Sequence, residues 1–175
     1  MHELFYSPVD VARIIGRHML PITDAMKLTR RIWQEDNAYL RSEYRSDYKK
    51  WALAVMYWSD YMQDKAAMDA EFSAVQEMCG GELSDESMLR DDFDMDLFFK
   101  DLRIRILFIS KNECVWMKLR TLLEDYGYKR RSREFVRFVK DRLYFYHIQT
   151  ALTGNHICDV ETMDRLDDMI TFRVL

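Results

Sequence analysis

The sequence has 175 residues, of which 49% are hydrophobic and 14% aromatic, and it carries a net charge of −4. This composition excludes a wholly disordered chain and provides enough apolar material for one domain or two small ones. Its three cysteines, none of them in a CxxC pair, argue against a secreted scaffold held by disulfides. With five glycines and two prolines, long stretches lack helix breakers, so the composition favours a mainly α fold.

The sequence contains no obvious targeting or membrane signal. No stretch reaches the roughly 18 to 20 uninterrupted apolar residues that a membrane-spanning helix needs. The first residues, Met-His-Glu-Leu-Phe, lack the basic start, the apolar run and the small-residue cleavage site of a secretory signal. We therefore expect a cytoplasmic protein without a membrane partner.

The first helix is expected to start at Ser7 and Pro8, because serine caps helix N-termini and proline suits the first helical turn. Thr23 predicts the cap of a second helix that begins at residue 24. Apolar residues at helical spacing would form the buried face of the first helix: Val9, Val11, Ile14, Ile15 and Met19.

Residues 24–79 contain neither glycine nor proline, and their apolar residues recur at helical spacing. One helix of this length would be far longer than usual, so we expect two helices with a break near residues 45–47. Residues 1–81 are therefore predicted to form an N-terminal helical bundle.

The two long helices of this bundle carry more aromatic side chains than one narrow core stripe can hold. Tyrosine and tryptophan are favoured in protein interfaces, so we expect the bundle to mediate assembly, as a homodimer or with a protein partner. A wide core closed by the C-terminal helices is the alternative. The aromatic residues are Trp33, Tyr39, Tyr44, Tyr48, Trp51, Tyr57, Trp58 and Tyr61.

The charges are divided unevenly along the chain. Residues 64–101 hold 12 acidic and 3 basic side chains, a net of −9, whereas residues 102–142 hold 12 basic and 5 acidic ones, a net of +7. Residues 82–96 are acidic and poor in apolar residues. We interpret them as a linker between the bundle and a C-terminal module, residues 97–175.

The C-terminal module is expected to begin with helices. One helix is predicted from about residue 94 to residue 109, although the apolar alternation in residues 104–108 also fits a strand. Ser110 and Glu113 have the spacing of a capping box, which predicts a further helix that ends before Gly127.

Ser132 can cap the following helix, whose apolar residues continue toward Leu152 and which would stop at Gly154. Residues 169–174 alternate apolar and polar side chains and predict a strand, paired with residues 156–160. The predicted fold is thus mainly α, with an N-terminal helical bundle and C-terminal helices that carry a small β-hairpin.

Basic residues are concentrated around the predicted start of the helix at Ser132. The free N–H groups and the dipole of a helix N-terminus add to side-chain charge, so this pattern is typical of a phosphate site. A solvated face, or a docking surface for an acidic partner or for the acidic linker, is the alternative. The residues are Lys129, Arg130, Arg131, Arg133, Arg137 and Lys140.

Residues 112–174, interpreted as a helix, a short basic turn, a second helix and two strands, resemble the winged helix-turn-helix family. The resemblance implies a DNA-binding regulatory protein whose second helix enters the major groove while the turn holds phosphates. It places Lys129, Arg130 and Arg131 on the DNA backbone. The side chains implied to face DNA are Ser132, Arg133, Glu134, Arg137 and Lys140.

Arg142 and His147 have the Arg-x4-His spacing of HEPN ribonucleases, which this short segment also resembles. The resemblance implies a metal-independent ribonuclease, with His147 as acid or base and Arg142 stabilising charge at phosphorus. Residues five apart on one helix point about 140° from each other, so one copy does not build a site and a dimer is required.

Other catalytic patterns are absent from the sequence, which has no GxSxG, P-loop, HExxH or Rossmann glycine motif. His147, His156 and Cys158 have no spacing typical of a metal site, so we expect neither a metal nor a cofactor. The main hypothesis is a non-catalytic nucleic-acid-binding protein. The alternatives are a protein-interaction adaptor that binds no nucleic acid, and the ribonuclease.

Overall fold

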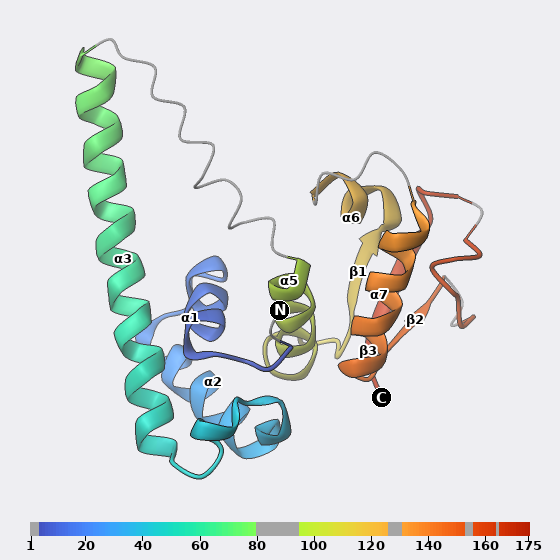
Figure 1. Cartoon of the computed structure of the whole chain (residues 1–175), viewed down its shortest axis with the longest axis horizontal. Helices are drawn as coiled ribbons and strands as arrows, with labels where there is room; N and C mark the ends of the chain where they lie inside the picture. The colour runs from blue at the N-terminus through green and yellow to red at the C-terminus, as the bar shows by residue number, and fades with distance from the viewer. Residues whose placement is uncertain (1–3, 80–94, 126–130, 153–155, 164) are drawn as a thin grey trace. The chain divides into compact units, whose positions relative to one another are not determined.

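The structure is a computed structural model that describes residues 4–79, 95–125, 131–152, 156–163 and 165–175, with the backbone alone described for residues 64–79 and 125. The chain divides into two compact units, Met1–Glu86 and Ser87–Leu175 (Figure 1). Both are mainly helical, and the second also holds a three-stranded sheet. The mainly α fold is therefore confirmed, with a sheet of three strands where a two-stranded hairpin was predicted.

The acidic linker was predicted at residues 82–96, which mostly lie outside the described residues. The last two residues of that stretch, Met95 and Asp96, are described, and they belong to the first turn of helix α5. The linker itself stays a prediction. Among the described residues, no helix combines the length and the apolar character that crossing a membrane requires.

Unit 1 is built from three α-helices and two short 3-10 helices in its described part. The helices α1 and α2 both pack on the long helix α3. In chain order the elements are α1 (Pro8–Arg17), α2 (Ile22–Glu35), η1 (Asn37–Tyr39), η2 (Ser42–Tyr44) and α3 (Tyr48–Cys79).

The start of α1 is confirmed where Ser7 and Pro8 predicted it. The Ser7 hydroxyl accepts a hydrogen bond from the Asp10 backbone N–H at 3.2 Å, and the Asp10 carboxylate accepts one from the Ser7 N–H at 2.8 Å. Val11, Ile14 and Ile15 are buried as expected. Met19 is 87% exposed, because it lies beyond the helix in a left-handed turn with φ 47°, so its predicted burial is wrong.

The helix α2 begins at Ile22 and has no side-chain cap, so the cap predicted at Thr23 is wrong. The predicted break at residues 45–47 is confirmed, since α3 starts at Tyr48, but the interruption reaches back to the end of α2. Tertiary hydrogen bonds explain its length. The Tyr6 N–H donates to the Tyr39 carbonyl at 2.7 Å, and the Tyr6 carbonyl accepts from the Arg41 N–H at 3.2 Å.

Trp51 of α3 lies at the centre of unit 1. Its side chain is 0% exposed, and its indole N–H donates to the Thr29 carbonyl of α2 at 3.1 Å. Val55, one turn further along α3, is also fully buried. A single side chain therefore fills the core and satisfies a polar group between two helices, as a buried tryptophan must.

Replacing Trp51 by Ala should lower the free energy of unfolding by about 3 to 5 kcal/mol, because it leaves a cavity and removes the hydrogen bond from the indole to α2. Urea unfolding followed by circular dichroism measures the change. Met26→Ala on α2 is the control, since Met26 is exposed and its loss should change stability by roughly 0.5 kcal/mol or less. Equal losses in the two variants would contradict the assignment of Trp51 to the core.

Unit 2 combines helices with the sheet. The chain enters through a helix that ends in a π-helical turn, then forms a short strand, two helices and two more strands. In chain order they are α5 (Met95–Ile104), η3 (Arg105–Ile109), β1 (Val115–Lys118), α6 (Leu119–Asp125), α7 (Arg133–Phe145), β2 (Ile148–Ala151) and β3 (Met169–Val174).

The sheet is antiparallel, with β3 between β1 and β2. Ile170 faces Met117 of β1, and Phe172 faces both Val115 of β1 and Thr150 of β2. Ile170 and Phe172 are fully buried. Because side chains alternate between the faces of a strand, these residues put one face of the sheet into the core of unit 2.

The helix predicted from Ser110 is wrong in its first half, where the chain forms β1. Ser110 closes a turn: its hydroxyl accepts from the Asn112 N–H at 3.4 Å and donates to the Cys114 carbonyl at 3.0 Å. Glu113 has φ 52°, which a helix does not allow. Helical structure begins at Leu119 and continues toward the predicted end.

The helix capped by Ser132 is shorter than predicted. It ends at Phe145, and His147 turns the chain with φ 50° into β2, where helix was expected to continue toward Leu152. The last strand, β3, has the predicted bounds, 169–174. Its predicted pairing with residues 156–160 is wrong, because β1 and β2 are its partners, and Ile157 bridges to Ala151 at the end of β2.

Candidate nucleic-acid interface

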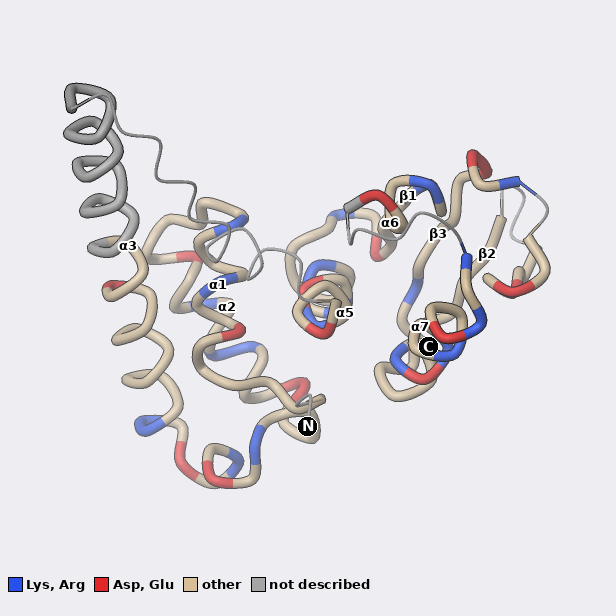
Figure 2. The backbone as a smooth tube through the Cα atoms, turned by 45° about the horizontal axis from the view of Figure 1, so that its top comes forward, with Lys and Arg blue, Asp and Glu red and all other residues tan. Residues whose placement is uncertain are grey.

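The candidate interface is the outer face of α7. Ser132 caps this helix as predicted, and its hydroxyl accepts a hydrogen bond from the Phe135 N–H at 3.1 Å. One side of α7 is buried in unit 2, through Phe135, Val136, Val139 and Leu143. The opposite side is therefore left to solvent, and it carries both basic and acidic positions (Figure 2). The exposed residues are Arg133, Glu134, Arg137, Asp141 and Tyr144.

Arg133 and Arg137 are the exposed arginines of this face, one turn apart near the start of α7. Within the described residues neither forms an ion pair or a side-chain hydrogen bond. Two guanidinium groups on successive turns at a helix N-terminus are well placed to contact an anionic ligand. Lys129 and Arg130, predicted to hold phosphates beside them, lie outside the described residues.

Arg131 has a structural role that the sequence did not indicate. Its Nη1 donates to the carbonyls of Val160 and Met163, at 3.0 and 2.6 Å. Both acceptors lie in the connection between β2 and β3, which we call the acidic loop, residues 156–168. The guanidinium predicted to hold a DNA phosphate thus ties the acidic loop to the start of α7.

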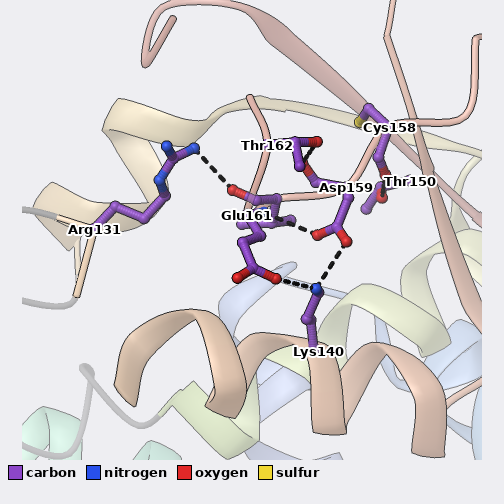
Figure 3. Close-up of polar contacts among 8 residues, drawn as sticks. Arg131, Lys140, Thr150, Cys158, Asp159, Glu161 and Thr162 are labelled. Atoms are coloured by element: carbon purple, nitrogen blue, oxygen red, sulfur yellow. Dashed lines mark hydrogen bonds and ion pairs between the residues drawn. The ribbon is translucent and has the colours of Figure 1, made fainter. Parts of the chain in front are cut away.

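Lys140 is paired with two carboxylates of the acidic loop. Its Nζ lies 2.7 Å from Asp159 Oδ2 and 2.6 Å from Glu161 Oε2 (Figure 3). Hydrogen bonds to Asp159 and then to Glu161 raise the pKa of Lys140, so the ammonium stays charged. The positive charge of Lys140, which the sequence assigned to a phosphate, is therefore already neutralised by carboxylates of the same protein.

Asp159 is held in place by its own surroundings. Burial alone would raise the pKa of this carboxyl, but the hydrogen bonds from Lys140 and from the Glu161 N–H keep it below its ordinary value. The Glu161 N–H donates to Asp159 Oδ1 at 2.8 Å, leaving Oδ2 for Lys140. The carboxylate therefore stays ionised and points at α7.

The segment before Asp159 is fixed to β2. The Thr150 hydroxyl donates to the Cys158 carbonyl at 2.6 Å, and the Cys158 N–H donates to the Thr150 carbonyl at 3.0 Å. Burial raises the pKa of the Cys158 thiol, which disfavours the reactive thiolate. Cys158 thus serves to position the acidic loop.

The far end of the acidic loop is fastened to α6. The Arg120 guanidinium binds Asp167 through two hydrogen bonds, at 2.8 and 2.9 Å, and the Arg120 N–H donates to the Leu166 carbonyl at 2.8 Å. The ion pair with Arg120 lowers the pKa of Asp167. Sequence reasoning missed this pair, because nothing local connects residues 47 positions apart.

The two residues of the ribonuclease alternative lie in different structural settings. Arg142, on α7, pairs with Asp96 of α5 at 2.8 Å, with 15% and 5% of their side chains exposed. Its guanidinium also lies 3.6 Å from the centre of the Phe138 ring. His147 is exposed in the turn after α7. The catalytic role of this pair stays a prediction, and Arg142 is engaged in holding α7 to α5.

The described residues contain no group of three or more histidine, cysteine or acidic side chains able to hold a metal ion. Comparisons of the chain with family models, with curated proteins and with solved structures found no match. From the contacts described above, the candidate site has two arginines that are open to a ligand, Arg133 and Arg137. Beside them lies Lys140, which is already paired with carboxylates of the acidic loop.

Proposed function

We propose that the protein is a non-catalytic, cytoplasmic regulator that binds nucleic acid, DNA foremost, through α7 of unit 2. The observation that carries this proposal is the pair of exposed arginines, Arg133 and Arg137, which have no ion-pair partner within the described part of the chain. Arginine suits phosphate oxygens and guanine edges because its guanidinium presents a planar fork of donors.

The order of elements in unit 2 supports the proposed likeness to the winged helix-turn-helix family. The helices α6 and α7 follow each other, and β2 and β3 come next with a loop between them. The strand β1 adds a third strand to the same sheet. In that family the second helix of the pair enters the major groove, and here the second helix is α7.

The geometry of α7 suits a groove-binding role. Its buried side packs in unit 2, so the exposed face is held by a rigid element rather than by a loop. Arg133 and Arg137 are separated by about 6 Å along the helix axis, so both can reach one ligand. The helix dipole adds positive potential at the same end.

Replacing Arg133 and Arg137 by Ala should weaken binding of a labelled DNA duplex at least about tenfold. The slope of log K against log salt should fall by about 1.8, since each phosphate contact contributes about 0.9. Fluorescence anisotropy titrations between about 50 and 200 mM salt measure both quantities.

The matched control is Arg30→Ala with Lys49→Ala, which removes two exposed positive charges from unit 1. Binding that falls equally in both double variants would reflect net charge alone and would contradict the site. A labelled RNA is titrated in parallel and checked on a denaturing gel. RNA shortened by the wild type and left intact by His147→Ala would favour the ribonuclease alternative.

We also propose that unit 1 mediates assembly, as a homodimer formed through α3. Leu53, Tyr57 and Tyr61 are 61%, 63% and 51% exposed and lie on successive turns of this helix. Their face is opposite to the one that Trp51 and Val55 bury. Such a row of large apolar side chains on a surface is typical of a protein interface.

Two further features support a second copy as the occupant of this face. The Trp58 ring packs edge-on against Tyr57 and Tyr61, at 5.5 and 5.6 Å between centroids, so the aromatic surface is ordered before it binds. Exposed Lys50 and Asp60 lie near opposite ends of the row. An antiparallel pair of α3 helices would bring Lys50 of each copy beside Asp60 of the other.

Tyr57→Glu should convert the dimer into a monomer, because it places a carboxylate in the centre of the apolar row. Sedimentation velocity at micromolar concentration measures the mass. Met26→Glu, which adds the same charge to the exposed side of α2, should leave the mass unchanged. A monomeric wild type, or a Tyr57→Glu protein that is still dimeric, would count against this interface.

A further inference from the structure

The acidic loop presents its carboxylates to the basic row of α7 that the proposed function uses. Arg133, Arg137 and Lys140 lie within about 60° of one another around the helix, so they form a single row. Two of the three are open to a ligand. The third, Lys140, is bound by Asp159 and Glu161 at 2.7 and 2.6 Å (Figure 3).

The charge along this row is therefore uneven. At the N-terminal end, Arg133 and Arg137 supply two positive charges. At Lys140, two carboxylates outweigh one ammonium, which leaves a net charge of −1 that repels an approaching phosphate. The acidic loop therefore has two effects: its carboxylates pair with Lys140, and they repel a phosphate that approaches the same position.

The backbone of the acidic loop is anchored at Val160 and Met163, whereas its two carboxylates are partly open to solvent. Val160 and Met163 are buried, and the Arg131 guanidinium bonds the carbonyls of both residues. By contrast, the side chains of Asp159 and Glu161 are 43% and 63% exposed. A phosphate can therefore compete with them for Lys140, with Glu161 rotating away and Asp159 keeping its hydrogen bond from the Glu161 N–H, without unfolding of the loop.

We infer that Asp159 and Glu161 act as an internal mimic of a nucleic-acid phosphate, which competes for Lys140 and suppresses non-specific binding along α7. This inference rests on the proposed function. Exposed ion pairs are weak, so a backbone phosphate in a well-fitted complex displaces the carboxylates. A phosphate in a poorly fitted complex does not displace them. The loop thereby widens the difference in affinity between well-fitted and poorly fitted nucleic acids.

Asp159→Asn combined with Glu161→Gln removes both charges while keeping the size of the side chains. It should tighten binding of a random-sequence DNA duplex roughly eightfold at 0.1 M salt, because one added phosphate contact steepens the salt slope by about 0.9. When Lys140→Ala is added to the amide variant and compared with Lys140→Ala alone, the gain should shrink to the part that comes from removing the repulsion of the two carboxylates.

Two controls separate this effect from others. Glu43→Gln with Asp24→Asn removes two exposed carboxylates from unit 1 outside the proposed dimer interface, and it reports the effect of net charge alone. Glu161→Gln by itself keeps the turn that Asp159 makes with the Glu161 N–H, so it tests the idea even if the double amide variant unfolds. It should give a smaller gain in the same direction.

The outcomes distinguish this inference from the proposed function beneath it. If the amide variant binds DNA more tightly than the wild type, with a steeper salt slope and a gain that depends on Lys140, the result supports both the phosphate mimic and the proposed function. Wild-type binding with no gain in either amide variant, or a gain that is equally large without Lys140, overturns the phosphate mimic and leaves the proposed function standing. If neither the wild type nor any variant binds DNA at low salt, both are overturned.

Discussion

Unit 2 depends on the pairing of β3 with two strands that are distant from it in the sequence. The six residues of β3 form hydrogen bonds with β1 on one side and β2 on the other. The side chains of Ile170 and Phe172 on β3 are buried in the core of unit 2. This pairing closes the connection between β2 and β3 into a loop that returns over α7. The contact between Lys140 and the two carboxylates is thus a consequence of sheet topology.

The basic cluster of the sequence separates in the structure into residues with different roles. Arg131 organises the acidic loop, Lys140 is neutralised by it, and Arg133 and Arg137 remain open among the described residues. A net charge of +7 counted over residues 102–142 therefore overstates the charge that a ligand meets on α7. For the proposed binding, the decisive quantity is the number of cations without a partner, because each of these can release a counterion from a phosphate.

The features that the sequence predicted correctly are those with a local cause. Ser7 and Ser132 cap helices through contacts three residues away, and β3 shows its alternation within one short segment. The capping spacing of Ser110 and Glu113 was equally local and was wrong, because pairing of Val115 with Phe172 outweighs it. In the site, α7 and its arginines could be predicted, whereas the partners of Arg131 and Lys140 could not, since no local pattern links α7 to the acidic loop.

The anchoring of α7 also bears on which of its arginines can act on a ligand. Arg142 pairs with Asp96, and Arg103 of α5 donates to the Tyr146 carbonyl at 2.5 Å, so the C-terminal end of α7 is fixed to α5. Removing Arg142 would break a nearly buried ion pair with Asp96 and a contact that holds α7 to α5. Contacts through Arg133 and Arg137 require no such change. Ligand binding through Arg133 and Arg137 is therefore favoured over catalysis by Arg142, which would first have to leave its ion pair with Asp96.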